Sequence, residues 1–197
     1  GLVATDSVWL YIDDVLSKRG LAASTTLSLT TDVLSDNNYE FKIKAKDYAG
    51  NVSEFSPSLN LIVDTTPYTI TSNPDLLESD DSGFLTDDDL TNVRIPSFEF
   101  DELSSKADSI KLFVNNGISN QFVIGGRKTA DILTDTLTIP NGSKLDEGEY
   151  VISYVVIDSA GNESVSSAGT TVRIDFTSPD KSILPDLRTD DDSGFLA

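Results

Sequence analysis

Apolar and polar residues alternate with a period of two along several short segments of the chain. In residues 39–46 every odd position is apolar and every even position is charged, and residues 150–157 repeat the alternation with Tyr, Ile, Tyr and Val on one face. This period is typical of strands with one face toward a core and one toward water. Trp9 lies on the polar side of its segment, so we expect it on an outer surface. Further strands are predicted over 7–14, 58–64, 67–78, 93–100, 109–116 and 169–175.

Several motifs recur at a fixed distance. Residues 47–51 read DYAGN and residues 158–162 read DSAGN, an offset of 111 positions. The same offset relates DDSGFL at 80–85 to DDSGFL at 191–196. A period near one hundred residues is the size of a compact domain and too long for a solenoid repeat.

The repeat predicts three units. Residues 1–65 form a first unit, residues 66–176 a complete second unit, and residues 177–197 the start of a third. SVWLYIDD at 7–14 matches SIKLFVNN at 109–116. Far fewer residues precede this match in the first unit than in the second. We therefore expect the first unit to lack its early strands and to be open along one side.

Short strands separated by turn signals, with no helical stretch, predict an all-β fold: tandem Ig-like or fibronectin-III-like β-sandwich domains joined end to end. A Leu followed five positions later by a Tyr occurs at Leu34 and Tyr39, and again at Leu145 and Tyr150. The spacing resembles the tyrosine corner of such sandwiches. The alternative is a Tyr that only packs against its neighbours.

The composition removes several classes of function. The chain has no Cys, His or Met, which excludes disulfide scaffolds, Cys/His zinc sites and Ser–His–Asp catalysis. The formal net charge of −19 disfavours nucleic acid and anionic lipid as partners and attracts cations. The sequence has no apolar run long enough for membrane insertion, and its first residues do not resemble a signal peptide. Paired acids leave a glycosidase-like site open by residue type.

An ordered set of motifs carries a family resemblance. Asp81-Ser-Gly83-x4-Asp88-x2-Thr91-Asn92 opens the second unit, and Val63-Asp64-Thr-Thr-Pro and Ile174-Asp175-Phe-Thr-Ser-Pro close the two units. With the DxAGN turns, the set resembles bacterial Ig-like repeats of giant, type I-secreted (RTX-type) surface adhesins. The resemblance implies an extracellular extender module on the bacterial cell surface, in which Ca²⁺ at the domain junctions stiffens the chain.

Aspartates are concentrated where calcium would be expected. Asp80, Asp81 and the run 87–89 place five carboxylates within ten residues around Gly83. Calcium binds six to eight oxygens, and carboxylates are its preferred side-chain ligands. The resemblance favours Asp81 and Asp88 as ligands, while Thr91 is expected either to contribute or to hydrogen-bond the backbone. The alternative is a solvated acidic loop.

The turns give a second group of candidates. In an Ig-like sandwich the last hairpin turn faces the preceding domain, so Asp64 and Asp158 are expected to meet around one ion, with Asn162 or Asp101 nearby. Asp47 would serve the preceding junction, and Asp175 would lie near the 80–89 loop. The alternative is an ordinary Asp/Asn turn around Gly. The full set of candidate ligands is Asp47, Asp64, Asp80, Asp81, Asp88, Asp158, Asn162, Asp175, Asp191 and Asp192.

The repetition of the units favours a spacer over a binding tip. We expect no enzyme, because the Asp clusters lie in predicted turns and the sequence has no aromatic-rich groove that could hold a sugar. The expected partners are neighbouring repeats and calcium ions, with a host or biofilm surface contacted through other parts of the full-length protein. The alternative function is a calcium-dependent, lectin-like adhesion domain that contacts a glycan. A tip of that kind is expected to differ from its neighbours in sequence, whereas these units resemble each other.

Overall fold

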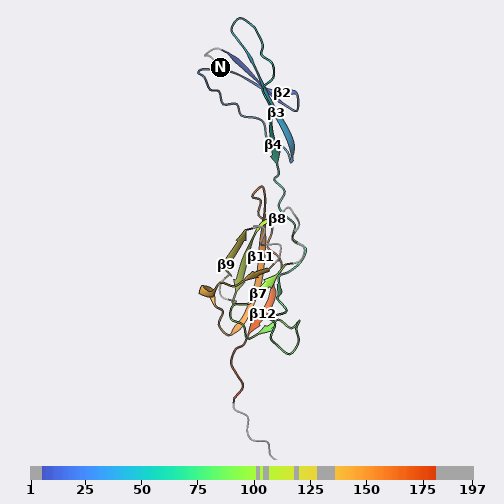
Figure 1. The fold of residues 1–197 in the computed structure, drawn as a ribbon, viewed down its shortest axis with the longest axis vertical. Helices are drawn as coiled ribbons and strands as arrows, with labels where there is room; N and C mark the ends of the chain where they lie inside the picture. The colour runs from blue at the N-terminus through green and yellow to red at the C-terminus, as the bar shows by residue number, and fades with distance from the viewer. Residues whose placement is uncertain (1–5, 101–102, 104–106, 118–119, 128–135, 181–197) are drawn as a thin grey trace, which may run out of the picture.

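The chain folds into two β-rich parts that follow each other along its long axis (Figure 1). The computed structural model describes residues 6–100, 103, 107–117, 120–127 and 136–180. Helical structure in the described part is one short 3-10 turn, Asn141–Ser143. None of it is long and apolar enough to cross a membrane.

The N-terminal part is one antiparallel sheet with the order β2-β1-β3-β4. Leu10 pairs with Ile43, and Phe41 pairs with Leu59, so the apolar side chains of three strands share one face, as the alternation predicts. The strands are β1 (Ser7–Ile12), β2 (Val15–Leu21), β3 (Asn37–Lys46) and β4 (Leu59–Val63).

The C-terminal part is a sandwich of two sheets. A five-stranded sheet has the order β6-β12-β11-β8-β9, and a three-stranded sheet has the order β10-β7-β5. The strands are β5 (Asp75–Leu76), β6 (Leu90–Thr91), β7 (Ser97–Glu99), β8 (Ala107–Asn115), β9 (Asn120–Arg127), β10 (Thr136–Thr138), β11 (Gly148–Asp158) and β12 (Thr170–Ile174).

The core lies between these two sheets. Phe98 and Phe100, at and just beyond β7, pack against the inner face of β11, and the rings of Phe100 and Tyr154 meet edge to face with centroids 4.8 Å apart. Ile152, Tyr154 and Val156 are buried, as the alternation in this strand predicts. The all-β sandwich expected from the sequence is confirmed.

The early strands of the second unit are shorter than the sequence predicts. Ladder pairing over 67–78 is limited to β5, and over 93–100 to β7. Pro67, Pro74 and Pro96 interrupt these segments, and proline has no N–H to donate to a ladder. Strands β2, β6, β9 and β10 were not predicted, although each forms an edge of one of the three sheets.

Both tyrosine corners are confirmed. The hydroxyl of Tyr39 donates to the carbonyl of Ser35 at 2.9 Å, and that of Tyr150 donates to the carbonyl of Asp146 at 3.1 Å. Each bond reaches four residues back and closes the loop before the strand. The bonds recur at the offset of the sequence repeat, so the two parts share this local structure.

Trp9 lies on the outer face of the N-terminal sheet, as expected. It stands opposite Arg19 on β2 and Lys44 on β3, and the Arg19 guanidinium lies 5.2 Å from its ring centroid. The position is stabilised by a cation–π contact rather than by burial in a core.

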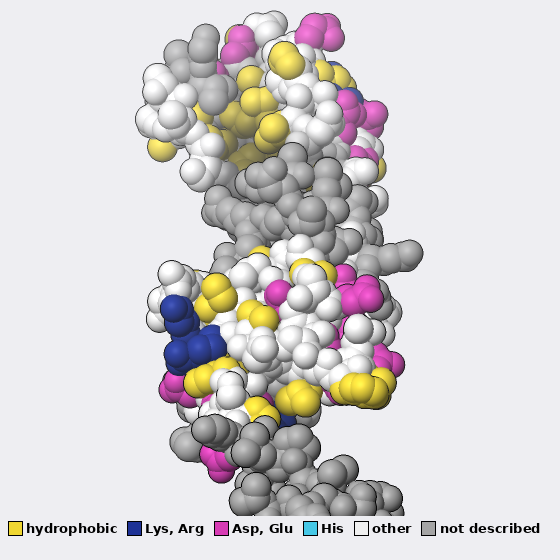
Figure 2. Space-filling view, turned by 60° about the horizontal axis from the view of Figure 1, so that its bottom comes forward, with side chains coloured by type: hydrophobic (Ala, Val, Ile, Leu, Met, Phe, Trp, Pro, Cys, Tyr) yellow, Lys and Arg dark blue, Asp and Glu magenta, His cyan; other side chains and the backbone are white. Residues whose placement is uncertain are grey.

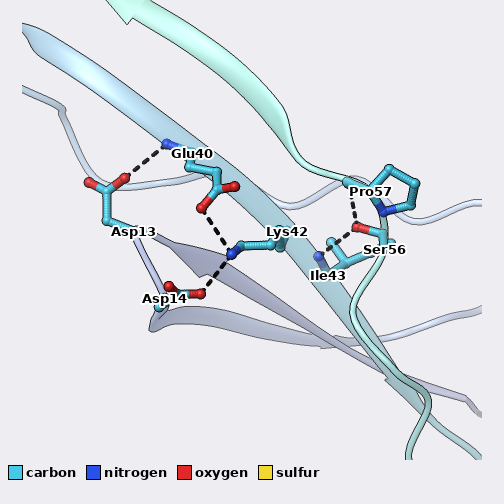
Figure 3. A network of polar contacts seen from close by, with 7 residues as sticks. All are labelled: Asp13, Asp14, Glu40, Lys42, Ile43, Ser56 and Pro57. Carbon is cyan, nitrogen blue, oxygen red and sulfur yellow. Dashed lines mark hydrogen bonds and ion pairs between the residues drawn. The ribbon is translucent and has the colours of Figure 1, made fainter.

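A polar network fixes the β1–β2 turn against β3 (Figure 3). Asp13 and Asp14 form the turn with positive φ values of 49° and 63°, a conformation that Asp tolerates better than most residues. Asp13 accepts the backbone N–H of Glu40 at 2.8 Å, and the Lys42 ammonium contacts Asp14 at 2.8 Å and Glu40 at 2.9 Å. These carboxylates are therefore occupied in holding the hairpin.

Candidate functional site

The two DxAGN turns have the same hydrogen bonds. Asp47 accepts the backbone N–H of Asn51 at 2.8 Å, and Asp158 accepts that of Asn162 at 2.9 Å. In both turns the Asn side-chain amide also donates to the Asp carboxylate, and these bonds hold the pKa of Asp47 and Asp158 below the usual range. Both carboxylates therefore have a clear role in shaping the turns.

Asn162 also connects the two parts of the chain. Its side-chain amide donates to the backbone carbonyl of Asp64 at 3.0 Å, at the end of the N-terminal sheet. Asp64 and Asp158 thus share the Asn162 amide as a hydrogen-bond donor, while the ion expected between them stays a prediction. Asp64 takes part through its carbonyl, while its own carboxylate accepts the N–H of Thr66 at 3.1 Å.

A second set of hydrogen bonds ties the linker, residues 65–67, to Asp36 just before β3. Asp36 accepts the N–H and the hydroxyl of Thr65, at 2.9 and 2.6 Å, and the hydroxyl of Thr66 at 2.6 Å. The Thr65 hydroxyl is the main cause of a lowered pKa at Asp36. We call this set of bonds the linker clamp.

The clamp recurs at the far end of the sandwich. Glu147, 111 positions after Asp36, accepts the N–H of Phe176 at 3.2 Å and the hydroxyl of Thr177. Sequence reasoning missed both acids. The available signal was an acid at one repeat position paired with a hydroxyl residue just after each closing strand.

In residues 80–89, which we call the acidic loop, Asp80 and Asp81 have different surroundings. The Asp80 carboxylate accepts the N–H of Ser97 at 2.7 Å and so anchors β7. Asp81 is only 7% exposed, and its Oδ2 accepts the N–H of Asp89 at 3.2 Å. Its buried Oδ1 accepts no hydrogen bond from the part of the chain that the structure describes. A buried carboxylate oxygen without a donor is costly, and a cation would satisfy it.

Other carboxylates crowd around Asp81. The pKa of Asp89 is raised, first by burial and then by the charges of Asp75, Asp81 and Asp88. Asp88 is exposed and lies against Gly83, where an added Cβ would come 2.5 Å from its Oδ1. The loop therefore concentrates negative charge that no cation of the described chain neutralises by an ion pair.

The hydroxyl of Thr91 hydrogen-bonds to two backbone groups. It is buried, its hydroxyl donates to the carbonyl of Asp80, and it accepts the N–H of Val93 at 2.9 Å. The hydrogen-bonding alternative for Thr91 is therefore the one that the structure adopts.

Asp175 lies beside the acidic loop, at the end where the chain leaves the sandwich. Its N–H donates to the carbonyl of Thr91 at 2.9 Å, and it borders a hollow shared with residues 82–84 and 90–92. Asp101, Asp191 and Asp192 lie outside the described residues.

The two candidate sites differ in how well they fit a metal ion. Within the described residues, no three acidic side chains are arranged to hold one. The acidic loop nevertheless offers an unsatisfied oxygen on Asp81 in a strongly negative environment, which fits a hard cation. At the junction, the Asp158 oxygens accept turn hydrogen bonds, and Asn162 presents an N–H rather than an oxygen to Asp64.

A family model and a solved structure with a TM-score above 0.5 agree with this fold. A sequence model described as "Bacterial Ig-like domain" matches residues 68–176, more than half of the chain. The FN1–FN3 domains of chicken CNTN1 are similar with a TM-score of 0.52 and 10% identity, covering 87% of this chain and 56% of that one. The fibronectin(III)-like modules of Clostridium thermocellum CbhA give a TM-score of 0.45 at 15% identity, covering 88% of this chain and 80% of that one.

A galactokinase from Staphylococcus carnosus (strain TM300) is 40% identical over 68 residues. The match covers 34% of this chain, and the chain spans only 18% of the galactokinase. A match of that length says nothing about the chemistry of the whole enzyme.

Proposed function

Because the chain belongs to the bacterial Ig-like domain family, we propose that it is a non-enzymatic extender module of a bacterial cell-surface adhesin. In this proposal residues 1–65 and 66–176 are successive domains, residues 177–197 begin a third, and calcium ions stiffen the rod. The rod projects an adhesive tip that lies elsewhere in an exported, RTX-type protein.

The observation that carries the spacer role is the linker between the two parts. Asp36 holds Thr65 and Thr66 from one side, and Asn162 holds the carbonyl of Asp64 from the other. A linker bonded at both ends restricts the relative orientation of the parts it joins. Such restriction is what a spacer requires, and a flexible tether would not need it.

The calcium role is supported by the acidic loop. Asp81 has a buried oxygen that accepts no hydrogen bond from the described residues, and the nearby charges of Asp75, Asp88 and Asp89 repel one another. Asp81 and Asp88 are the proposed ligands at this end, with Asp80 and Asp175 beside them. Asp191 and Asp192 would repeat this loop in the third unit. Asp64, Asp158 and Asn162 are proposed for the central junction and Asp47 for the preceding one.

Isothermal titration of the full chain with calcium in physiological salt tests this proposal. We expect saturable binding in the millimolar range or tighter, and a lower stoichiometry in Asp81→Asn and in Asp64→Ala. Asp32→Asn is the matched control, because Asp32 is exposed and forms a surface ion pair with Lys18. The absence of saturable heat, or one stoichiometry in all four proteins, would reject calcium binding at these residues. Binding to a glycan array would favour the lectin-like alternative instead.

A further inference from the structure

The inner face of the N-terminal sheet is open, although the matching face of the sandwich is closed. Ile43 and Leu61 are 39% and 44% exposed. Tyr154 and Val172, which occupy the same repeat positions in the sandwich, are 1% and 0% exposed. Figure 2 shows hydrophobic side chains gathered in a hollow of the N-terminal part. Apolar sheet faces of this kind are normally covered by a second layer.

The sandwich shows what kind of layer fits. Its five-stranded sheet is covered by β10, β7 and β5, from which Phe98 and Phe100 insert with 0% and 2% exposure. Phe100 stacks edge to face on Tyr154, the counterpart of Ile43. The position that an aromatic side chain covers in the sandwich is therefore the one left exposed in the N-terminal sheet.

The N-terminal part contains a segment that corresponds to one of the three strands of this layer. Residues 26–29 read TLSL and match TLTI at 136–139, the segment of β10. The side chains of Leu27 and Leu29 approach Gly20 on β2, but residues 26–29 form no strand. In the sandwich, β10 pairs with β7 through Leu137 and Phe98. The counterpart segment lacks that partner among the residues described.

We infer that the open face is a docking site for a polypeptide segment built like residues 67–100 and supplied from outside the N-terminal sheet. Its central strand pairs with residues 26–28, as β7 pairs with β10. Two alternating aromatic side chains then cover Ile43 and Leu61. The inference rests on the repeat and on burial, so it holds whether or not the chain binds calcium.

A graft tests this inference in the full chain. A copy of residues 67–102 placed directly before Gly1 leaves eight residues between its Phe100 and Ser7, the same spacing that separates Phe100 from Ser109. The covalent link raises the effective concentration of the segment. We expect the backbone amides of β3 to exchange with solvent at least tenfold more slowly than in the ungrafted chain, and those of β11 to be unchanged.

Two controls identify the contact. The graft with its own Phe98 and Phe100 changed to Ser, and the intact graft combined with Leu61→Asp, should both lose the protection of β3. Unchanged exchange in the intact graft, or equal protection with the Ser-substituted graft, would overturn the inference. So would a concentration-dependent dimer of the ungrafted chain with a protected β3, because a second copy would then be the occupant.

Discussion

Asp89 is the carboxylate whose ionisation the sandwich opposes. It is half-buried, has a φ of 56°, and faces the charges of Asp75, Asp81 and Asp88. A folded-state pKa above the unfolded value means that the folded chain holds this proton more tightly. The contribution of Asp89 to stability is then fully present below its unfolded pKa of 3.8 and is lost as the pH rises through the raised value.

Asp89→Asn should therefore stabilise the calcium-free protein at neutral pH by about 1 kcal/mol or less, since the site is partly screened by solvent. Asn keeps the shape of the side chain and tolerates the left-handed backbone. Urea unfolding at pH 7 and below pH 4 measures the effect, and the gain should vanish at the lower pH. A gain of equal size at both values would show that charge is not the cause.

The alternation of apolar and polar residues predicted the strands better than residue types predicted the roles of individual carboxylates. The alternation in residues 39–46 and 150–157 was sufficient, because burial acts on one face of a strand whatever lies beyond it. The role of Asp80 could not be predicted in the same way. Its bond to the N–H of Ser97 depends on a chain path that local sequence does not encode. Asp36 and Glu147 were missed for a different reason, because their signal lies in the repeat spacing rather than in a local motif.

At the scale of elements, the second DxAGN turn both reverses the chain and contacts the end of the preceding part. Asp158 and Asn162 close the turn between them, and the Asn162 amide then reaches the last carbonyl of the preceding part. Asp47 and Asn51 form the same turn without such a contact in the described chain. The two turns thus share these bonds, and the second adds the contact to Asp64 and a bond from the N–H of Ala160 to Asp158.

Asn162→Ala and Asn51→Ala should separate the two roles. Each substitution removes the side-chain amide bond to the turn carboxylate and should cost about 1 kcal/mol locally. Only Asn162→Ala should also broaden the relative orientation of the two parts, because it alone removes the bond to Asp64. Residual dipolar couplings measured on both parts report this orientation. Equal broadening in the two variants would mean that Asn162 does not hold the junction.

Element boundaries were the least predictable level of the fold. The segment over 67–78 has strand-like composition, yet only Asp75–Leu76 forms a strand, and Pro67 and Pro74 each lack an N–H that a ladder could use. β6 is a two-residue strand parallel to β12, and pairing between segments so far apart in sequence leaves no local pattern. The open first unit was predictable, because the repeat itself showed which strands it lacks.

At the scale of the molecule, the two parts should differ in stability. The sandwich buries a continuous core of two sheets, whereas the N-terminal sheet leaves one apolar face in water. A single sheet gains less from burial per ordered residue and should open at a lower free energy.

Trp9 makes this difference measurable, since it is the one tryptophan of the chain and lies in β1. Its fluorescence should change at a lower temperature than the main transition in far-UV circular dichroism, which follows both parts. A gap of several degrees is expected for a difference of about 1–2 kcal/mol in domains of this size. Coincident transitions would show instead that the two parts unfold as one cooperative unit.

The parallel pairing of β6 with β12 has a mechanical consequence. β6 belongs to the early part of the sandwich, and β12 leads to its exit. Tension applied through the chain would pull these strands in opposite directions along their own axes. The bonds from Arg173 N–H to Asp89 and from Asp175 N–H to Thr91 would then be loaded together, in shear, rather than one after another. The same loop that gathers negative charge therefore also carries the hydrogen bonds that must shear before the sandwich can be pulled open from its two ends.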